Sequence, residues 1–329
     1  MSQISAVPRH CIAGQSTPSE PRTEDHVTPL APDPATTFEP YRRHLTGLAY
    51  RMIGSLTDAE DIVQNTYLRW HKVDRAAVTD VRSYLSKAVA RLCLDHLKSA
   101  RVRREAYVGT WLPEPVLDSA AHAADSASEY ANDLSFGFLL TLERLSPLER
   151  AAFLLHDVFG LSFDEIGHVL DRPAAACRQL AVRARAHLRD AGRRLAPSEA
   201  ESARLLGAFQ QAMVTGDVAG FAQLLADDAI LYSDGGGKRA AALNPIYGRD
   251  KIVRFVVGTF GKTGLPPPER VMRVSVNGMP GLVLIDPGGS PETIALEIGN
   301  NGVAAIYAVR NPDKLRHVEV AVSGATPGD

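Results

Sequence analysis

The pattern of apolar residues changes near residue 201, and this change sets what the chain can fold into. Before it, apolar side chains mostly recur at the three- and four-residue spacing of helices. After it, two helices and a strand lead to one more helix and four strand-like runs, which Asn-Gly, Pro-Gly-Gly and Gly-Asn-Asn-Gly turns separate. Such turns join antiparallel strands into hairpins. We therefore predict a multidomain protein, with all-α domains followed by an α+β cone whose helices cover one face of a curved sheet.

The predicted elements follow from the same patterns. Helices are expected at about 38–54, 58–73, 81–104, from about 134 to Gly160, from Ser162, and at 174–191, 201–215, 217–226 and 249–260. Strands are expected at 228–233, 270–277, 281–286, 292–298 and 302–309. Residues 1–37 are rich in Pro, Ser and Thr and are predicted to be disordered. Residues 105–133 read as a linker, and 320–329 as a tail.

Composition excludes several classes of protein. Hydrophobic residues make up 45% of the 329 residues and charged residues 22%, which is ordinary for domains that bury a core. The cysteines Cys11, Cys93 and Cys177 have no paired spacing, which argues against a disulfide framework and a cysteine-rich zinc site. No apolar run approaches the roughly 20 residues of a membrane-spanning helix, and the N-terminus lacks an apolar signal core. We expect a cytoplasmic protein with no membrane partner, metal or cofactor.

An acidic helix start follows the first predicted helix. Thr57 and Glu60 have the spacing of a capping box, which predicts that Thr57 caps this helix. Together with Glu60, the side chains of Asp58, Asp61 and Gln64 present acceptors on one or two adjacent faces. A lone acidic run is usually a solvated helix face. The alternative is a docking surface, where complementary charge steers a partner.

Positive charge is concentrated in two blocks, although the net charge is only −2. Residues 81–104 hold seven Lys or Arg and one Asp, and residues 172–194 hold seven Arg and one Asp. Such clusters suit phosphate groups. Tyr84 could stack on an unpaired base or belong to the core. The candidate nucleic-acid contacts of the first block are Arg82, Tyr84, Lys87, Arg91, Lys98, Arg101, Arg103 and Arg104.

Two strong helix starts and a tight turn predict a helix-turn-helix. Ser146 and Ser162 each stand three residues before a Glu, and Gly160 ends the helix between them. Asp171 and Pro173 turn the chain into a last, Arg-rich helix.

This last helix has two distinct faces. Its core face is predicted to hold Cys177, Leu180, Ala184 and Leu188. Arg can bind guanine, Gln can bind adenine, and further Arg can hold phosphates. The candidate contacts on the other face are Arg178, Gln179, Val182, Arg183 and Arg185. The alternative is a solvated basic face.

Three short runs are candidates for contacts between domains. The linker run joins a large aromatic anchor to stiffening prolines and a carboxylate: Trp111, Leu112, Pro113, Glu114, Pro115. A second run has three glycines that free backbone N–H groups for an anion or carbonyl: Asp234, Gly235, Gly236, Gly237, Lys238. The third holds a Pro that fixes an extended approach: Asn311, Pro312, Asp313, Lys314, Leu315. We expect both lysines to support a grip on the linker. For the glycine run, the alternative is a plain turn.

In their order along the chain, these motifs resemble a known family. The acidic helix followed by Asp80–Leu85 is similar to the clamp-binding helix and promoter-melting segment of extracytoplasmic-function (ECF) RNA polymerase sigma factors. The helix-turn-helix at 162–190 looks like their second promoter-binding domain. The three short runs resemble signatures of one subgroup, which carries a C-terminal SnoaL-like domain of the nuclear-transport-factor-2 type.

The resemblance implies a sigma factor that binds core RNA polymerase and promoter DNA and initiates transcription. Asp58, Glu60, Asp61 and Gln64 would contact the polymerase, and the C-terminal domain would regulate activity in cis. No catalytic residue is expected. The implied divisions are sigma-70 region 2 at 38–104, the linker at 105–133, sigma-70 region 4 at 134–194 and the SnoaL-like domain at 201–319.

Two rival functions concern the C-terminal domain. SnoaL-like folds also house cyclases and isomerases that use a buried carboxylate, and the candidate polar residues here are Asp234, Tyr232 and His317. A third interpretation is a small-molecule ligand bound in the cone. A polar pocket with a buried ionised carboxylate would favour chemistry, an open apolar pocket a ligand, and a filled core a structural regulator.

Overall fold

The structure is a computed structural model that describes residues 33–105, 107–117, 133–190, 198–263 and 268–323. Helix α1 begins at Pro34, inside the segment 1–37 that we predicted to be disordered. Asp33 caps this helix, because its carboxylate accepts the Ala35 N–H at 3.1 Å, and proline at the first helical position needs no partner for an N–H. The rest of that predicted tail, residues 1–32, lies outside the described residues.

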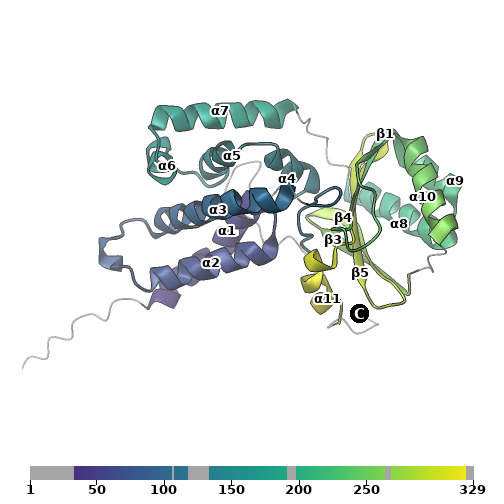
Figure 1. Ribbon diagram of the computed structural model, residues 1–329, viewed down its shortest axis with the longest axis horizontal. Helices are drawn as coiled ribbons and strands as arrows, with labels where there is room; N and C mark the ends of the chain where they lie inside the picture. The colour runs from purple at the N-terminus through teal and green to yellow at the C-terminus, as the bar shows by residue number, and fades with distance from the viewer. Residues whose placement is uncertain (1–32, 106, 118–132, 191–197, 264–267, 324–329) are drawn as a thin grey trace, which may run out of the picture. The chain divides into compact units, whose positions relative to one another are not determined.

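Three helices and a short 3₁₀ turn form the first helical domain (Figure 1). Their bounds are α1 Pro34–Ile53, α2 Leu56–Trp70, η1 Arg75–Ala77 and α3 Val81–Glu105. The core between them includes the buried side chains of Leu48, Trp70 and Leu85. The indole N–H of Trp70 is donated to the Thr37 hydroxyl at 3.1 Å, so this large ring is buried without losing a hydrogen bond.

The N-cap of α2 differs from the prediction. Ser55 caps the helix, because its hydroxyl accepts the Asp58 N–H at 3.1 Å. Thr57 lies inside the first turn, where its N–H is donated to the carboxylate of Glu114 at 3.0 Å. The spacing of Thr57 and Glu60 was therefore misleading, since a residue distant in the sequence supplies the second acceptor.

The second helical domain contains the predicted helix-turn-helix. Its elements are α4 Phe136–Glu143, α5 Pro147–Phe153, the π-helical η3 Leu154–Val158, α6 Phe163–Leu170 and α7 Ala174–Asp190. Both predicted capping boxes are present, from Ser146 to Glu149 and from Ser162 to Glu165. The π-helical turn was not predicted, because one inserted residue leaves little trace in helical spacing.

The two helical domains share one hydrophobic core, whose buried cluster includes residues from α1 through α7. The rings of His44 and Phe159 meet edge-on, with centroids 4.6 Å apart. The buried guanidinium of Arg150 in α5 donates to the Met52 carbonyl at the end of α1 and to Glu143 at 2.7 Å. Each domain thus covers apolar surface of the other.

The C-terminal domain is a six-stranded sheet with helices, as predicted in type. Its elements are α8 Glu199–Thr215, α9 Val218–Leu224, β1 Leu225–Asp234, β2 Ile246–Tyr247, α10 Arg249–Thr263, β3 Arg270–Val276, β4 Met279–Ile285, β5 Pro291–Gly299, β6 Gly302–Val309, η4 Pro312–Lys314 and α11 Arg316–Ser323. The strand order is β2-β1-β6-β5-β4-β3. The three predicted hairpins from β3 to β6 are antiparallel, and β1 pairs with β6 in parallel.

Three short elements of this domain were not predicted. Strand β2 has two residues, η4 is a single turn, and α11 extends to Ser323, into the segment 320–329 that we read as a tail. None of these elements is long enough to show a clear period in the sequence. Residues 324–329 lie outside the described residues. Within the described part of the chain, no helix is both long and apolar enough to cross a membrane.

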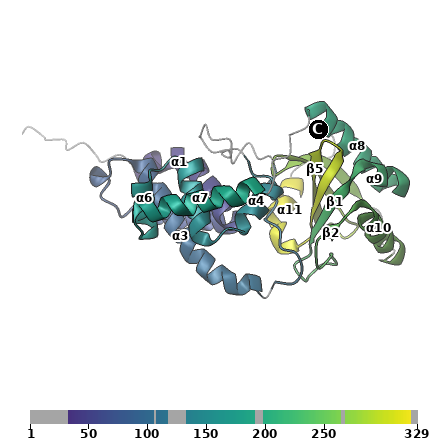
Figure 2. The ribbon, with the colours of Figure 1, turned by 90° about the horizontal axis from the view of Figure 1, so that it is seen from above.

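Both faces of the sheet are buried. Helices α8, α9 and α10 cover one face, and α11 lies against the other (Figures 1 and 2). The first face packs Leu282, Leu296 and Ile306 against Phe209 of α8. The second face packs against residues from outside the domain as well as against α11. The outside residues that are buried in this second core are Leu112 of the linker and Phe136 of α4, and Leu117 and Leu140 pack against it.

We predict that Gly54→Ala destabilises the protein more than Gly160→Ala. Both glycines have positive φ, 73° and 74°, so both substitutions carry the same backbone strain of about 1–2 kcal/mol. A Cβ at Gly54 would lie 2.5 Å from the ring of Trp111, whereas a Cβ at Gly160 would meet nothing within 4 Å. Thermal melting followed by circular dichroism measures both. If both substitutions lower the melting temperature equally, the stability of the fold does not depend on the close approach of Trp111 to Gly54.

Candidate functional site

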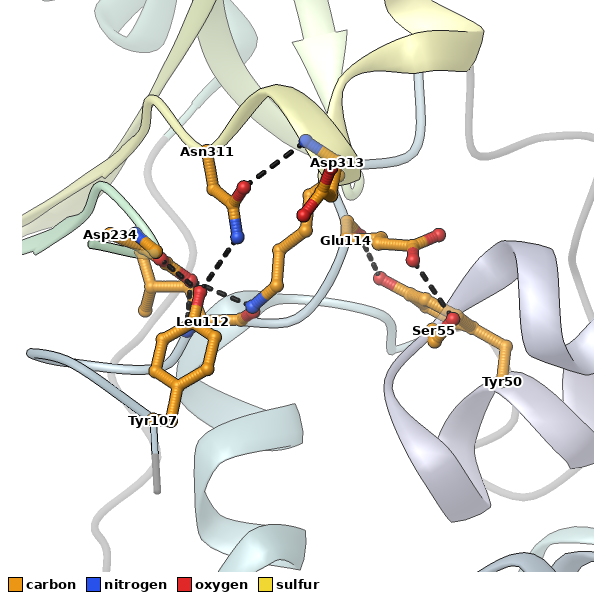
Figure 3. Close-up of polar contacts among 10 residues, drawn as sticks. Tyr50, Ser55, Tyr107, Leu112, Glu114, Asp234, Asn311 and Asp313 are labelled. Atoms are coloured by element: carbon orange, nitrogen blue, oxygen red, sulfur yellow. Dashed lines mark hydrogen bonds and ion pairs between the residues drawn. The ribbon is translucent and has the colours of Figure 1, made fainter. Parts of the chain in front are cut away.

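The centre of the site is the carboxylate of Asp234, at the end of β1 (Figure 3). This side chain is fully buried. Its oxygens accept the backbone N–H of Leu112 at 2.8 Å, the ammonium of Lys314 at 2.7 Å and the N–H of Gly236 at 3.0 Å. The hydroxyl of Tyr107 also donates to it. A buried charge is stable only when it is paired and hydrogen-bonded, and two of these four partners come from the linker.

Lys314 ties the same linker residue from a second direction. Its ammonium donates to the Leu112 carbonyl as well as to Asp234. It also lies 4.3 Å from the ring centre of Trp111 and 4.9 Å from that of Tyr107. Cation–π contacts of this kind strengthen when the charge is desolvated. The C-terminal domain therefore binds both the N–H and the carbonyl of Leu112, and it contacts the rings of Trp111 and Tyr107.

Tyr107 is a site residue that sequence reasoning missed. Its hydroxyl donates to Asp234 and accepts from the side-chain amide of Asn311 at 2.9 Å. Burial and the hydrogen bond to Asp234 raise the pKa of this phenol well above its usual range, so it stays neutral and donates its proton. Nothing in the spacing marked Tyr107, because it stands four residues before the recognisable linker run.

The glycine-rich run serves the site through its backbone. Gly236 has a φ of 59°, and a Cβ there would lie 2.2 Å from the side-chain amide of Asn311. We predicted that backbone N–H groups of this run bind an anion or a carbonyl oxygen. The Gly236 N–H donates to the carboxylate of Asp234, so the bound anion belongs to the same run. Lys238, which we expected to support the grip on the linker, instead forms an exposed ion pair with Asp313 at 2.6 Å.

The linker is held at a second point, two residues after Leu112, by Glu114. Its buried carboxylate accepts the Ser55 hydroxyl at 2.8 Å and the N–H groups of Leu56 and Thr57 at 2.8 and 3.0 Å. These donors form the N-terminus of α2, where a negative charge is favourable. The hydroxyl of Tyr50 in α1 donates to the Glu114 carbonyl at 2.6 Å. Glu114 thus joins the linker to the first helical domain.

Asn277 makes a second connection that the sequence did not reveal. It lies in the tight turn between β3 and β4 with a φ of 52° and is buried. Its side-chain oxygen accepts the Val116 N–H at 2.9 Å, and its side-chain nitrogen donates to Tyr50 at 2.7 Å and to the Leu134 carbonyl at 3.0 Å. The Asn-Gly pair predicted only a hairpin, yet its Asn joins three distant segments.

The three candidate polar residues of the C-terminal domain all contact other residues of the chain. Asp234 is saturated by the partners above, and the ring of His317 is hydrogen-bonded to the Pro115 carbonyl. The ring of Tyr232 stacks on that of Tyr307 at 5.2 Å. Among the described residues, no group of three or more metal-ligating side chains occurs. Leu112 and Phe136 are buried on this face of the sheet, and a filled core is the arrangement that favours a structural regulator.

The acidic face of α2 is largely accessible. Glu60, Asp61 and Gln64 are exposed. Asp58 is partly covered, and one of its carboxylate oxygens lies 3.5 Å from the ring of His96 in α3. This contact joins the start of α2 to α3.

The basic residues of α3 have varied surroundings. Tyr84 is 38% exposed and its ring lies against that of Trp70 at 5.6 Å, while Leu85 is fully buried. Arg82 is half-buried, and Lys98 is exposed and paired with Asp95 at 2.8 Å. Lys87 and Arg91 contact α6, as described below. The side chains of Arg101, Arg103 and Arg104 lie outside the described residues.

The core face of α7 is confirmed, since Cys177, Leu180 and Ala184 are buried and Leu188 packs against them. Arg178, Gln179, Val182 and Arg183 are exposed.

Arg185 does not share this outward face. Its guanidinium forms two hydrogen bonds to Asp157 of η3, at 2.8 and 3.0 Å. Arg183 lies 3.1 Å from Glu149 yet keeps an exposed side chain, and Arg178 lies over the Phe163 ring at 5.2 Å. Arg178, Gln179, Val182 and Arg183 therefore present the accessible surface.

Comparison with known proteins agrees with this architecture. Residues 37–103 match the family description of sigma-70 region 2, and residues 136–188 match that of sigma-70 region 4. Among the described residues these segments comprise α1 to α3 and α4 to α7.

Individual relatives extend the similarity beyond the helical domains. The ECF RNA polymerase sigma factor SigJ of Mycobacterium tuberculosis is 38% identical over 290 residues, covering 84% of this chain and 92% of that protein. The probable ECF sigma factor SigI of the same organism is 34% identical over 180 residues, covering 54% and 62%. The crystal structure of M. tuberculosis SigJ matches with a TM-score of 0.65 and 35% identity, covering 85% of this chain and 98% of that one. With two sigma domains, a linker and a C-terminal α+β domain in the same order, this chain belongs to the ECF RNA polymerase sigma factors and is SigJ-like.

Proposed function

We propose that this sigma factor binds core RNA polymerase, recognises promoter DNA and initiates transcription, and that its C-terminal SnoaL-like domain regulates these steps in cis. The observation that carries the regulatory proposal is the buried Asp234 carboxylate, which the linker and Lys314 saturate together. Since RNA polymerase acts on chromosomal DNA, we expect the protein to work in the cytoplasm.

The two sigma domains divide the work. The exposed acidic face of α2 suits a basic partner surface, and we assign it to core polymerase. The exposed face of α7 is basic and lies on the second helix of a helix-turn-helix, which suits the major groove of the upstream promoter element. The start of α3 carries an accessible Tyr84 beside basic residues, which suits unpaired bases and phosphates at the melted element.

Regulation follows from how the linker is held. Asp234 and Lys314 hold Leu112, and Glu114 holds the start of α2, only two residues further along. A change in the C-terminal domain that releases Leu112 therefore changes the connection between the two sigma domains. Coupling of about 1–3 kcal/mol between two arrangements would change activity roughly 5- to 150-fold.

A transcription assay tests the whole proposal. Purified core polymerase is mixed with full-length protein and a library of promoters, and the transcripts are sequenced. We expect transcription from a subset of promoters that share two elements. Failure to transcribe any promoter in the library would contradict the sigma-factor assignment for this chain.

On the docking surface, we predict that Asp61→Lys weakens association with core polymerase and leaves thermal stability unchanged. Asp61 is exposed, and exposed charges contribute at most about 1 kcal/mol to stability. Glu201→Lys makes the same charge change at an exposed position of α8 and serves as the control. If immobilised core polymerase retains both variants equally, the acidic face of α2 is a solvated helix face and not a docking surface.

On the promoter-reading helix, we predict that Arg178→Ala and Arg185→Ala have different effects. Arg178 is accessible, so its loss should weaken promoter binding by about 1–3 kcal/mol if it reads a base, and should relax preference at one position. Arg185 is bound to Asp157, so its loss should mainly lower the melting temperature. Binding to promoter variants and melting curves separate the two. Normal promoter binding by Arg178→Ala would exclude it as a reader.

On the linker contact, we predict that Lys314→Met changes transcription in the same direction as Trp111→Ala, whereas Lys238→Met has little effect. Removing Lys314 leaves the buried Asp234 without its counter-charge, which costs about 3–5 kcal/mol. The Lys238–Asp313 pair is exposed and contributes about 1 kcal/mol or less. Promoter-dependent transcription by the full-length variants is the measurement, and indistinguishable results for the two lysines would contradict a grip through Asp234.

A further inference from the structure

The first turn of α6 lies against α3 and uses a carboxylate that also caps its own helix. One oxygen of Glu165 accepts the Ser162 N–H at 3.0 Å, within the capping box. The other oxygen accepts the hydroxyl of Ser83 and lies 3.2 Å from the ammonium of Lys87. One turn further along α6, the His168 carbonyl accepts from the guanidinium of Arg91. A single face of α6 thus contacts a single face of α3.

The α3 residues in this contact stand at positions 83, 87 and 91, four residues apart each time, so they share one face of the helix. Lys87 and Arg91 are two of the residues that we assign to phosphate contacts at the melted promoter element. Their charged groups point at the helix-turn-helix domain. In this arrangement the two promoter-reading domains contact each other through part of the surface that one of them needs for DNA.

The chemistry of Glu165 matches that of a phosphate. An ionised carboxylate and a phosphate both offer anionic oxygens to Lys, Arg and hydroxyl donors. Hydrogen bonds from Ser83 and the Ser162 backbone lower the pKa of Glu165 to about 2, so the group is ionised at any physiological pH. The side chains of Lys87 and Glu165 are 28% and 34% exposed. A phosphate that binds the ammonium of Lys87 therefore competes with Glu165 for its N–H donors.

We propose that Glu165 is an intramolecular competitor of promoter DNA: it occupies Lys87 and Ser83 and keeps the DNA-binding face of α3 closed until α6 moves away. The proposal rests on the assignment of α3 to promoter contacts. The apparent affinity of a site that is open for only part of the time falls by that fraction. Weakening the Glu165 contact therefore raises DNA affinity by the same factor as it raises the open fraction.

The test compares two full-length variants, Glu165→Gln and Asp164→Asn. Glutamine can retain the capping box, but it removes the charge that holds Lys87. Asp164 is exposed in the same turn and, within the described chain, makes no hydrogen bond or ion pair to α3. Both variants remove one negative charge from the same helix start, so a general electrostatic gain in DNA binding is the same for both. Only the contact with α3 differs.

The probe is a fluorescein-labelled, mixed-sequence single-stranded DNA, and the readout is fluorescence anisotropy without polymerase. We expect Glu165→Gln to bind this DNA about two- to fivefold more tightly than Asp164→Asn, as an ion pair of this exposure implies. Ser83→Ala removes one hydrogen bond to Glu165 without changing net charge, and should also bind more tightly than the unaltered protein. Melting curves should show that all three variants are folded.

The outcomes separate the competitor from the proposed function. Equal affinities for Glu165→Gln and Asp164→Asn, or weaker binding by Glu165→Gln, would overturn the role of Glu165 even if the unaltered protein directs transcription from the promoter library. Absence of transcription by the unaltered protein would contradict the function itself. If transcription occurs and only Glu165→Gln and Ser83→Ala bind DNA more tightly, both proposals stand.

Discussion

The buried carboxylate of Asp234 is the interaction on which the arrangement of this protein depends. A charge in a fully buried position must be matched by a counter-charge and by hydrogen-bond donors. The domain itself supplies Lys314 and one backbone N–H, and the linker supplies Leu112 and Tyr107. Without the linker the buried carboxylate would lack two of its four hydrogen-bond donors, which is a physical reason for the domain to hold a segment that connects two other domains.

The C-terminal end of α1 is where the other contacts meet. The Met52 carbonyl accepts from Arg150 of the second sigma domain, and the Gly54 carbonyl accepts the Glu114 N–H at 2.9 Å. Helix C-termini leave carbonyl groups that need donors, and here the donors come from the helix-turn-helix domain and from the linker. A movement of the linker therefore changes contacts at the C-terminal end of α1, where the two promoter-binding domains also contact each other. The contact of Glu165 with Ser83 and Lys87 of α3 is a second connection between these two domains.

The sheet face that faces α11 is covered by other residues of the same chain. Small-molecule sites are usually concave and mostly apolar surfaces. In this chain Leu112 and Phe136 are buried on it, with the Phe136 ring stacked 5.2 Å from that of Tyr307. Asp234 at the end of β1 and His317 in α11 bind linker backbone groups. Residues of the linker and of α4 therefore cover the surface where a small-molecule site would be expected.

The sequence by itself determined most of the helices and strands, the two sigma domains, the helix starts at Ser146 and Ser162 and the family, because periodicity, capping and ordered motifs are local. It did not reveal Tyr107 or Asn277, the ion pair of Arg185 with Asp157, or the contact of Glu165 with α3. Each depends on groups distant in the sequence, and a polar residue shows its type but not its partner. Only the tertiary structure decided which charges are buried together, because burial makes a partner necessary and packing alone brings that partner within reach.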